Sequence, residues 1–356
     1  MTSNPSASLR LKKNKITDTN ITLSHGSGGR AMRDLINEIF VSNFDNNLLV
    51  PLEDQARFEM KDLAKIGDRL AFTTDSYVVS PLFFPGGDIG SLAVNGTVND
   101  LAVGGAIPLY LSCSFILEEG LSIDTLKTIV TSMKIAADKA AVKIVTGDTK
   151  VVPRGQGDQI FINTSGVGVI PAGINSGANN LQVGDRILLN GFLGDHGAAI
   201  LMARGELDLQ CTIESDCQAL NSLISAILAV CPEVKAMRDA TRGGLATVLN
   251  EFAQSSGVGI QVQETAIPIR EEVRGMCELL GLEPLYLANE GKLVLVVPPE
   301  AENRVLAVMR SHPDGKNAAS IGEVVASPPN LVYLKTPFGT NRILDMLVGE
   351  QLPRIC

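Results

Sequence analysis

The sequence predicts a mixed α/β (α+β) protein made of two α/β domains. Strand-like and helix-like segments alternate along the chain, which is typical of this class. The length of 356 residues exceeds that of one ordinary domain. The Gly-, Asn- and Pro-rich stretch PAGINSGANN, residues 171–180, interrupts the alternation near the middle of the chain. We expect this stretch to be the linker between the domains.

The first half predicts a polar arm over residues 1–22, followed by a glycine-rich loop and an amphipathic helix in LSHGSGGRAMRDLINEIF. Asp88 and Ser122 are predicted N-caps of two further helices, and Gly104-Gly105 ends the first of them. The other expected elements are a strand in residues 69–84 that ends near Asp75, a strand in 108–117, and two strands in 142–152 and 158–170.

The second half begins at VGDRILLNG, which is similar to IGDRLAFTTD in the first half. Two related half-domains or a common turn before a strand would explain this repeat equally well. A turn and a helix follow in MRDATRGGLATVLNEFAQSSG, then a strand in KLVLVVP, and ASPPN closes the unit. We therefore predict an arm with loop and helix at 1–45, an N-terminal domain at 46–172, a C-terminal α/β domain at 173–330 and a mobile tail at 331–356.

The composition argues against several classes of protein. A net charge of −9 disfavours nucleic-acid and anionic-membrane surfaces, and no apolar run reaches the roughly 18 residues of a membrane span. The N-terminal stretch lacks an apolar signal segment. Six cysteines without CxxC spacing and three scattered histidines indicate neither a disulfide framework nor a zinc site. We expect a cytoplasmic protein, in which an anionic substrate would need local cations such as a metal ion.

Acidic residues mark the first candidate site. Asp75, Asp100 and Asp239 each lie at a predicted strand end or beside glycine, where the backbone can approach a ligand. Carboxylates of this kind suit Mg²⁺, which takes oxygen ligands and bridges nucleotide phosphates. Asp54 and Asp148 are weaker candidates for the same role. Any one of these residues could instead be an ordinary cap or turn residue.

Two glycine clusters could bind phosphate through backbone N–H groups at helix starts. They are Gly26-Ser27-Gly28-Gly29 and Thr241-Arg242-Gly243-Gly244. Neither cluster is a P-loop or a dinucleotide-binding fingerprint, and each is a weak signal alone. Asn95 and Asn99, four residues apart on one predicted helix face, could add amide oxygens.

Three further residues are ambiguous without context. Lys150 and Glu290 lie beside turn residues, where they could neutralise phosphate charge and move a proton, or simply be solvated loop charges. Cys356 is the last residue. Its thiol is either an accident of the terminus or a reactive group on a movable arm.

Several segments together carry a resemblance. HGSGG, TTDSYVVSPLFFPGGDIG, NGTVNDLAVGGA, TGDTKVV, RDATRGGLA, LANEGKL and the terminal PRIC occur in that order. The chain therefore resembles the HypE family of hydrogenase maturation factors over nearly all of its length after about residue 20. That family is related to aminoimidazole ribonucleotide synthetase and selenophosphate synthetase.

The resemblance implies an ATP-dependent carbamoyl dehydratase with the fold of that superfamily. Cys356 would be carbamoylated by the carbamoyltransferase HypF, ATP would activate the carbamoyl oxygen, and loss of phosphate would leave a thiocyanate. The cyano group would pass to iron on a HypC–HypD scaffold for [NiFe] hydrogenase. The N-terminal domain would bind ATP and form a homodimer.

The resemblance also implies roles for individual residues. Glu290 would be the base, and Lys150 would orient or neutralise the thiocarbamate oxygen. The residues implied for Mg²⁺ are Asp75, Asp100 and Asp239, and those for ATP are Gly26, Ser27, Gly28, Gly29, Asp54, Asn95, Asp148, Thr149, Arg242, Gly243 and Gly244. The alternatives are another ATP-dependent synthetase or kinase of this superfamily, which leaves Cys356 unused, and a non-enzymatic carrier, which leaves the acidic and glycine positions unused.

Overall fold

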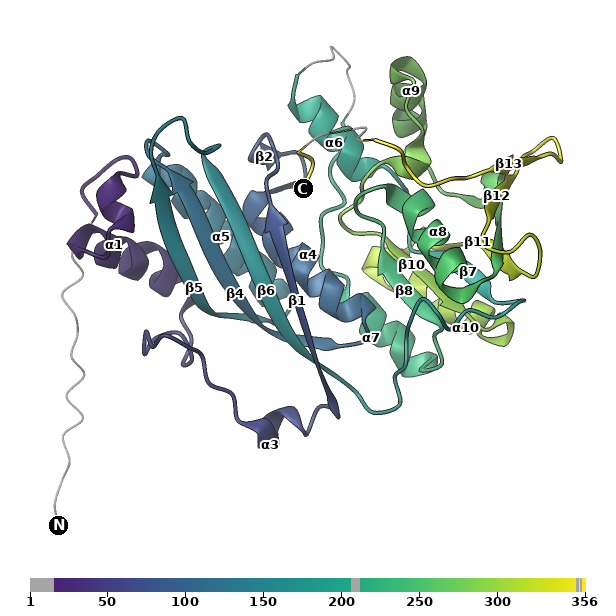
Figure 1. Ribbon diagram of the computed structural model, residues 1–356, viewed down its shortest axis with the longest axis horizontal. Helices are drawn as coiled ribbons and strands as arrows, with labels where there is room; N and C mark the ends of the chain where they lie inside the picture. The colour runs from purple at the N-terminus through teal and green to yellow at the C-terminus, as the bar shows by residue number, and fades with distance from the viewer. Residues whose placement is uncertain (1–15, 206–211, 350–351, 353) are drawn as a thin grey trace.

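Two α/β domains lie side by side in the computed structural model (Figure 1), which confirms the predicted fold class. The structure describes residues 16–205, 212–349, 352 and 354–356. Most of the predicted polar arm, residues 1–15, lies outside the described residues.

The N-terminal domain is a four-stranded sheet with the order β1-β6-β4-β5, in which only β4 and β5 are parallel. Helices α4 and α5 cover one face, and the other face is open toward the viewer in Figure 1. Its elements are η1 (Leu23–Gly26), α1 (Arg30–Leu35), the π-helical η2 (Ile36–Val41), α2 (Ser42–Phe44), α3 (Met60–Leu63), β1 (Arg69–Tyr77), β2 (Phe83–Phe84), β3 (Gly87–Asp88), α4 (Ile89–Val103), β4 (Ile107–Glu118), α5 (Ile123–Lys139), β5 (Lys143–Val152) and β6 (Ile160–Ile170).

Local sequence signals set the two covering helices. The Asp88 carboxylate accepts hydrogen bonds from the Gly90 and Ser91 N–H groups at the start of α4, and the Ser122 hydroxyl accepts from Asp124 and Thr125 at the start of α5. Both predicted N-caps are therefore confirmed, since each satisfies N–H groups that the helix leaves without partners.

The C-terminal domain is a seven-stranded sheet with the order β13-β12-β9-β11-β7-β10-β8. Helix α8 covers one face, and α7 and α10 cover the other. Its elements are β7 (Arg186–Leu189), α6 (Asp195–Ala203), α7 (Asn221–Val230), β8 (Ala236–Asp239), α8 (Gly244–Ser256), β9 (Gly259–Gln263), η3 (Glu264–Ala266), α9 (Glu271–Leu280), η4 (Pro284–Tyr286), β10 (Leu293–Val297), η5 (Pro299–Ala301), α10 (Glu302–Ser311), η6 (Pro313–Gly315), β11 (Ala319–Val325), β12 (Val332–Lys335) and β13 (Asn341–Ile343).

Strand β10, with the sequence LVLVV, is a strand in which apolar and polar residues do not alternate. Every residue of it is buried, because Val294 and Val296 pack under α8 while Leu293, Leu295 and Val297 face α7 and α10. A strand enclosed on both faces is apolar throughout.

The tail begins later than the sequence predicted. Strand β12 pairs with β9 in parallel, and β13 pairs with β12, so both belong to the C-terminal sheet. The predicted boundary at residue 330 is therefore two strands too early. Strand β12 joins the sheet by pairing with β9, which is far away in sequence, and β13 is added to it as a hairpin; a local pattern does not reveal the long-range pairing.

Helix α4 forms much of the seam between the domains. The side-chain oxygen of Asn99 accepts from Leu220 N–H at 2.7 Å, and its amide nitrogen donates to the Gln218 carbonyl at 3.0 Å. Asn99 is thus a structural residue, not a spare amide ligand. Among the helices that the structure describes, none has the length and apolarity needed to span a bilayer.

Candidate active site

The three predicted metal ligands meet at the seam between the domains. Asp75 lies on β1, Asp100 on α4, and Asp239 at the end of β8. The Thr73 hydroxyl donates to the Asp100 carboxylate at 3.0 Å. Burial, followed by repulsion from Asp100, raises the pKa of Asp239 to about 7. Burial also raises the pKa of Asp100, with a further contribution from Asp75.

These carboxylates suit a hard cation, because mutual repulsion in a partly buried site is relieved by a positive charge. Within residues 16–205, 212–349, 352 and 354–356, however, no three acidic, His or Cys side chains already stand in metal-binding geometry. Asp75, Asp100 and Asp239 could hold a cation by their chemistry, and their assignment as Mg²⁺ ligands stays a prediction.

Glu290 is buried at this seam and is not a solvated loop charge. Its side chain is 3% exposed, and its Oε1 atom has no hydrogen-bond partner. Burial is the largest cause that raises the pKa of Glu290 well above its ordinary value, and Asp239 and Asp216 add to the rise, while Arg242 opposes it. An unpartnered buried carboxyl is costly, and this cost is typical of a functional group rather than a packing residue.

The loop that carries Glu290 is held rigidly. Asp216 accepts from the Glu290 N–H at 3.0 Å, from the Gly291 N–H at 3.2 Å and from Lys292 Nζ at 2.8 Å. The adjacent Asn289 accepts from Gly194 N–H and donates to the Ala240 carbonyl, both at 2.8 Å. The polar groups around Glu290 are thus satisfied while its own Oε1 atom has no partner.

Arg242 connects the two domains at this point. Its guanidinium lies 3.8 Å from the Asp75 carboxylate, and the side chain is 70% exposed. Gly243 and Gly244, which follow it, both have positive φ, and a Cβ on Gly244 would lie 2.6 Å from two carbonyl oxygens. Only glycine therefore allows α8 to begin so close to the loop before β10.

The C-terminal tail returns to this seam. The Cys356 carbonyl accepts from Val78 N–H, and the Arg354 carbonyl accepts from Ser80 N–H, both at 3.2 Å, so the chain ends beside β2 (Figure 1). Ile355 is buried. Cys356 lines a cavity of about 250 Å³ together with Arg242. The tail predicted to be mobile is docked here, and Cys356 lies in the same cavity as Arg242, the ion-pair partner of Asp75.

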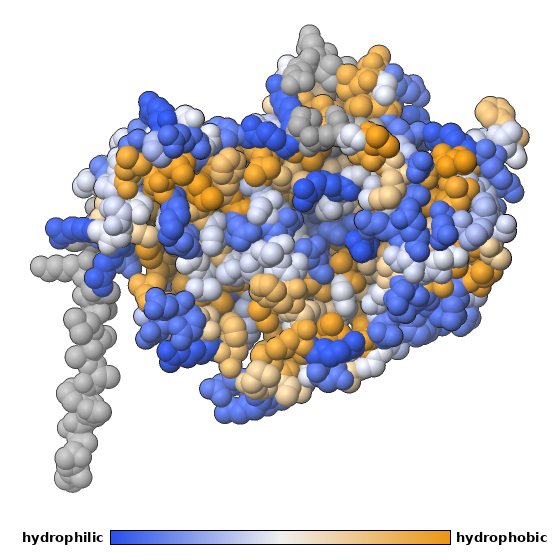
Figure 2. All heavy atoms as spheres, viewed as in Figure 1, coloured by the Kyte–Doolittle hydropathy of each residue, from blue (hydrophilic) through white to orange (hydrophobic). Residues whose placement is uncertain are grey.

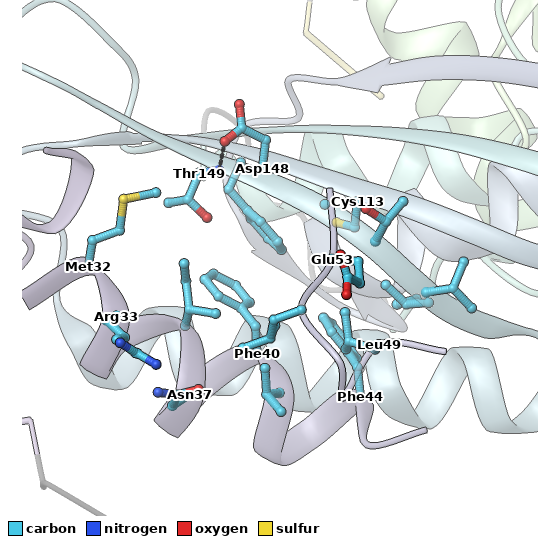
Figure 3. A pocket seen from close by; sticks show the side chains of 18 of the residues that line it. Met32, Arg33, Asn37, Phe40, Phe44, Leu49, Glu53, Cys113, Asp148 and Thr149 are labelled. Atoms are coloured by element: carbon cyan, nitrogen blue, oxygen red, sulfur yellow. Dashed lines mark hydrogen bonds between the residues drawn. The ribbon is translucent and has the colours of Figure 1, made fainter. Parts of the chain in front are cut away.

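A second, larger cavity of about 440 Å³ lies between the N-terminal helical segment and the edge of the sheet. Gly28, Gly29, Asp54, Asp148 and Thr149 all line it, so this part of the predicted nucleotide set comes together. Figure 3 shows the labelled side chains of Met32, Phe40 and Phe44 entering from the helical side, opposite Cys113 and Thr149 on the strands. Gly26 packs against Val151 of β5, next to the same loop.

The predicted nucleotide residues are therefore divided between two places. Arg242 and Gly243 line the Cys356 cavity, whereas the N-terminal glycines line the larger one. Strands β1 and β5 form opposite edges of the four-stranded sheet, about 14 Å apart at the usual strand spacing. Asn95 lines neither of these two cavities, and its amide nitrogen donates to Cys217 Sγ at 3.4 Å.

Lys150 does not reach Cys356 within one chain. It pairs across the sheet with the exposed Ile116, while its neighbour Thr149 is buried and pairs with Phe115. Lys150 thus points away from α4 and α5, and its Nζ forms an exposed ion pair with Asp148 at 2.7 Å. Asp75 faces the helices instead, because its strand partner Thr164 is bonded to Thr97 of α4.

Two residues at the seam, Asp216 and His196, were not identified from the sequence. Asp216 stands in ESDCQ without glycine or a strand end beside it, and its role depends on Lys292, 76 residues away. His196 stands in GDHG, and its glycine neighbours could have marked it as a residue near a ligand.

The fold and this site define the class of protein. The family of AIR synthase related proteins matches through its N-terminal domain at residues 53–170 and its C-terminal domain at residues 182–334. Carbamoyl dehydratase HypE of Rhodobacter capsulatus is 57% identical over 341 residues, which cover 96% of this chain and 99% of that protein. The chain belongs to the HypE family.

Solved structures agree. A crystal structure of the hydrogenase maturation protein HypE in complex with ATP superimposes with a TM-score of 0.89 at 49% identity, covering 94% of this chain and 99% of that one. HypE in a crystal structure of a HypE–HypF complex gives a TM-score of 0.76 at 48% identity, covering 88% and 99%.

Proposed function

We propose that this protein is an ATP-dependent carbamoyl dehydratase that acts on its own C-terminal cysteine. The observation that carries the proposal is the docking of Cys356 in a cavity that it shares with Arg242, whose charge acts on both Asp75 and the buried Glu290. A carrier needs no buried base, and a small-molecule kinase needs no thiol in its active site. The family relationship supports the same reaction.

The proposed dehydration has two stages, phosphorylation and elimination. Cys356 carries S–C(=O)–NH₂. Its carbonyl oxygen attacks the γ-phosphorus of ATP and releases ADP, and the nitrogen loses one proton. Elimination of inorganic phosphate with the second N–H proton then leaves S–C≡N. An amide oxygen is a poor leaving group and a phosphate is a good one, so phosphorylation makes the elimination possible.

Residues of this chain would accept the protons and neutralise the charge of the phosphates. Glu290 accepts an N–H proton, and its raised pKa makes it a stronger base once it is ionised. Arg242 neutralises phosphate charge at the seam. Mg²⁺, held by Asp75, Asp100 and Asp239, would neutralise charge on the phosphates.

The larger cavity supports binding of ATP. Its apolar wall suits an adenine base, and the N–H groups of Gly28 and Gly29 at its edge suit phosphate. Because this cavity and the Cys356 cavity lie at opposite edges of one sheet, we propose that a homodimer brings the cavity and Lys150 of one copy to Cys356 of the other.

The open face of the sheet supports that dimer. Leu70 and Phe72 are 55% and 72% exposed there, and Ile116 is 44% exposed beside Lys150. Figure 2 presents the side of the molecule on which this face lies, where orange residues gather among paler ones. Exposed apolar side chains on an uncovered sheet face support an interface there.

We also propose the partners. A HypF carbamoyltransferase would supply the carbamoyl group, as the HypE–HypF complex of a 48% identical neighbour suggests, and a HypC–HypD complex would accept the cyano group. The five described cysteines without disulfides fit the reducing cytoplasm.

The intact mass of the full chain tests the function. Mixing with the carbamoyl donor system should add one carbamoyl group at Cys356, and ATP with Mg²⁺ should then remove the mass of one water. Cys356→Ala should accept no carbamoyl group yet still bind ATP. Carbamoylation of Cys356→Ala, or no ATP-dependent loss of water by the native chain, would contradict the proposal.

A further inference from the structure

His196 stands between the docked tail and the loop that carries Glu290. It is the second residue of α6, it is fully buried, and its ring meets Phe84 edge to face at 5.5 Å. Its Nε2 lies 2.8 Å from the Ile355 carbonyl oxygen, and its Nδ1 lies 2.8 Å from the Ser215 hydroxyl. This buried ring therefore contacts the residue next to the reactive cysteine.

The hydrogen-bond partners assign the tautomer. A carbonyl oxygen only accepts, so Nε2 must carry the proton that is donated to Ile355. The Ser215 oxygen accepts from Cys217 N–H at 3.1 Å, and its own hydroxyl proton is donated to Nδ1. Burial lowers the pKa of His196, which favours this neutral form.

Both sides of His196 are fixed to the Glu290 loop. On the helix side, Gly194 N–H donates to Asn289 Oδ1, and Gly197 N–H donates to the Ala288 carbonyl at 3.1 Å. On the other side, Asp216, next to Ser215, accepts from the Glu290 N–H. The imidazole thus holds the tail against two segments that also set the position of Glu290.

We propose that His196 is a positioning residue, which fixes the docked tail relative to Glu290 for the dehydration step. The role rests on the proposed function. Docking the tail brings the carbamoyl group to the base, whereas carbamoylation by a partner requires the tail to leave the cavity. His196 therefore acts on dehydration and not on carbamoylation.

Two substitutions separate this role from a packing role. His196→Gln places an amide N–H near the former Nε2 and keeps the bond to Ile355, whereas the shorter His196→Asn does not reach it. Carbamoylated His196→Asn should lose water about 100-fold more slowly than the native chain, since small displacements of reacting groups cost this much. His196→Gln should stay within about 5-fold, because it retains that hydrogen bond. Both should be carbamoylated and should bind ATP normally, as should the control His312→Asn.

A second measurement does not depend on activity. The chain has three histidines, so ¹⁵N-histidine spectra can be assigned with the two His variants. The native chain should show His196 protonated on Nε2, with slow exchange of this proton, and removal of the last three residues should make exchange fast. If the native chain forms no thiocyanate but this signal depends on the tail, the proposed function fails and the role of His196 in dehydration fails with it, while its contact with the docked tail stands. Native-rate dehydration by His196→Asn, equal loss in both variants, or exchange that is independent of the tail would overturn the role.

Discussion

The guanidinium of Arg242 lies 3.8 Å from the carboxylate of Asp75, and this contact joins the C-terminal domain to the first strand of the N-terminal domain. Because Arg242 is mostly exposed, its ion pair contributes little to folding. Its charge is therefore available to phosphate.

Arg242→Ala should lower the rate of ATP-dependent dehydration by roughly 10²-fold, since it removes one cation from the phosphate site. The melting temperature should stay close to that of the native chain. The matched control is Arg304→Ala, which removes an arginine paired with Glu233 on the surface. Equal rates for the two variants would show that Arg242 has no role in the reaction.

The acidic residues should be required for nucleotide turnover. Asp75→Ala and Asp100→Ala should each abolish Mg²⁺-dependent ATP hydrolysis by the carbamoylated chain, because the metal loses a ligand, while circular dichroism remains native. Asp68→Ala, at an exposed position before β1, serves as the control. Full turnover in both variants with the metal chelated would refute the metal assignment.

Asp239 should destabilise the folded protein at neutral pH. Its pKa is about 7 in the folded chain and about 3.9 in an unfolded one. The contribution of the neutral Asp239 carboxyl to the stability of the folded chain is fully present below about pH 3.9. This contribution is lost as the pH rises to about 7. Asp239→Asn should therefore raise the free energy of unfolding without Mg²⁺ at pH 8, by up to about 4 kcal/mol, since each pKa unit corresponds to roughly 1.4 kcal/mol.

Urea unfolding at pH 5 and pH 8 measures this effect. The gain from Asp239→Asn should be larger at pH 8, and partial contact of the carboxyl with solvent makes the stated value an upper bound. A gain that shrinks as the pH rises would contradict the assignment.

Lys150 should act across the proposed dimer. Lys150→Ala and Cys356→Ala chains should each be inactive alone, because one lacks the cation and the other the thiol. Random mixed dimers hold one intact site in half of the molecules, so co-expression should restore roughly a quarter of the native dehydration rate. Lack of recovery in verified mixed dimers would place Lys150 in the same chain as its target cysteine or outside the site.

Much of the fold could be predicted from the sequence, because its signals are local. Asp88 and Ser122 cap their helices through N–H groups only two and three residues away. The aspartates at strand ends were found for the same reason. Strands β12 and β13 were missed, because β12 joins the sheet through pairing with the distant β9 and β13 is attached only through β12.

The assembly of the site was harder to predict. Gly28 and Gly243 belong to similar glycine-rich motifs and were predicted to bind the same nucleotide. The sheet, however, separates them into two cavities. Lys150 has the right charge for phosphate, but the alternation along β5 directs it to the open face. The role of Asp216 appears only when the loop at Glu290 folds over it.

In the proposed reaction, Glu290 removes the proton whose loss turns the carbamoyl group on Cys356 into a nitrile. The direct test is the intact mass of Glu290→Gln after carbamoylation, with and without ATP, beside the native chain and the surface control Glu233→Gln. Glu290→Gln should bind ATP and gain the carbamoyl group but remain at the carbamoyl mass, while the other two lose one water. Loss of water by Glu290→Gln at the native rate would contradict the claim.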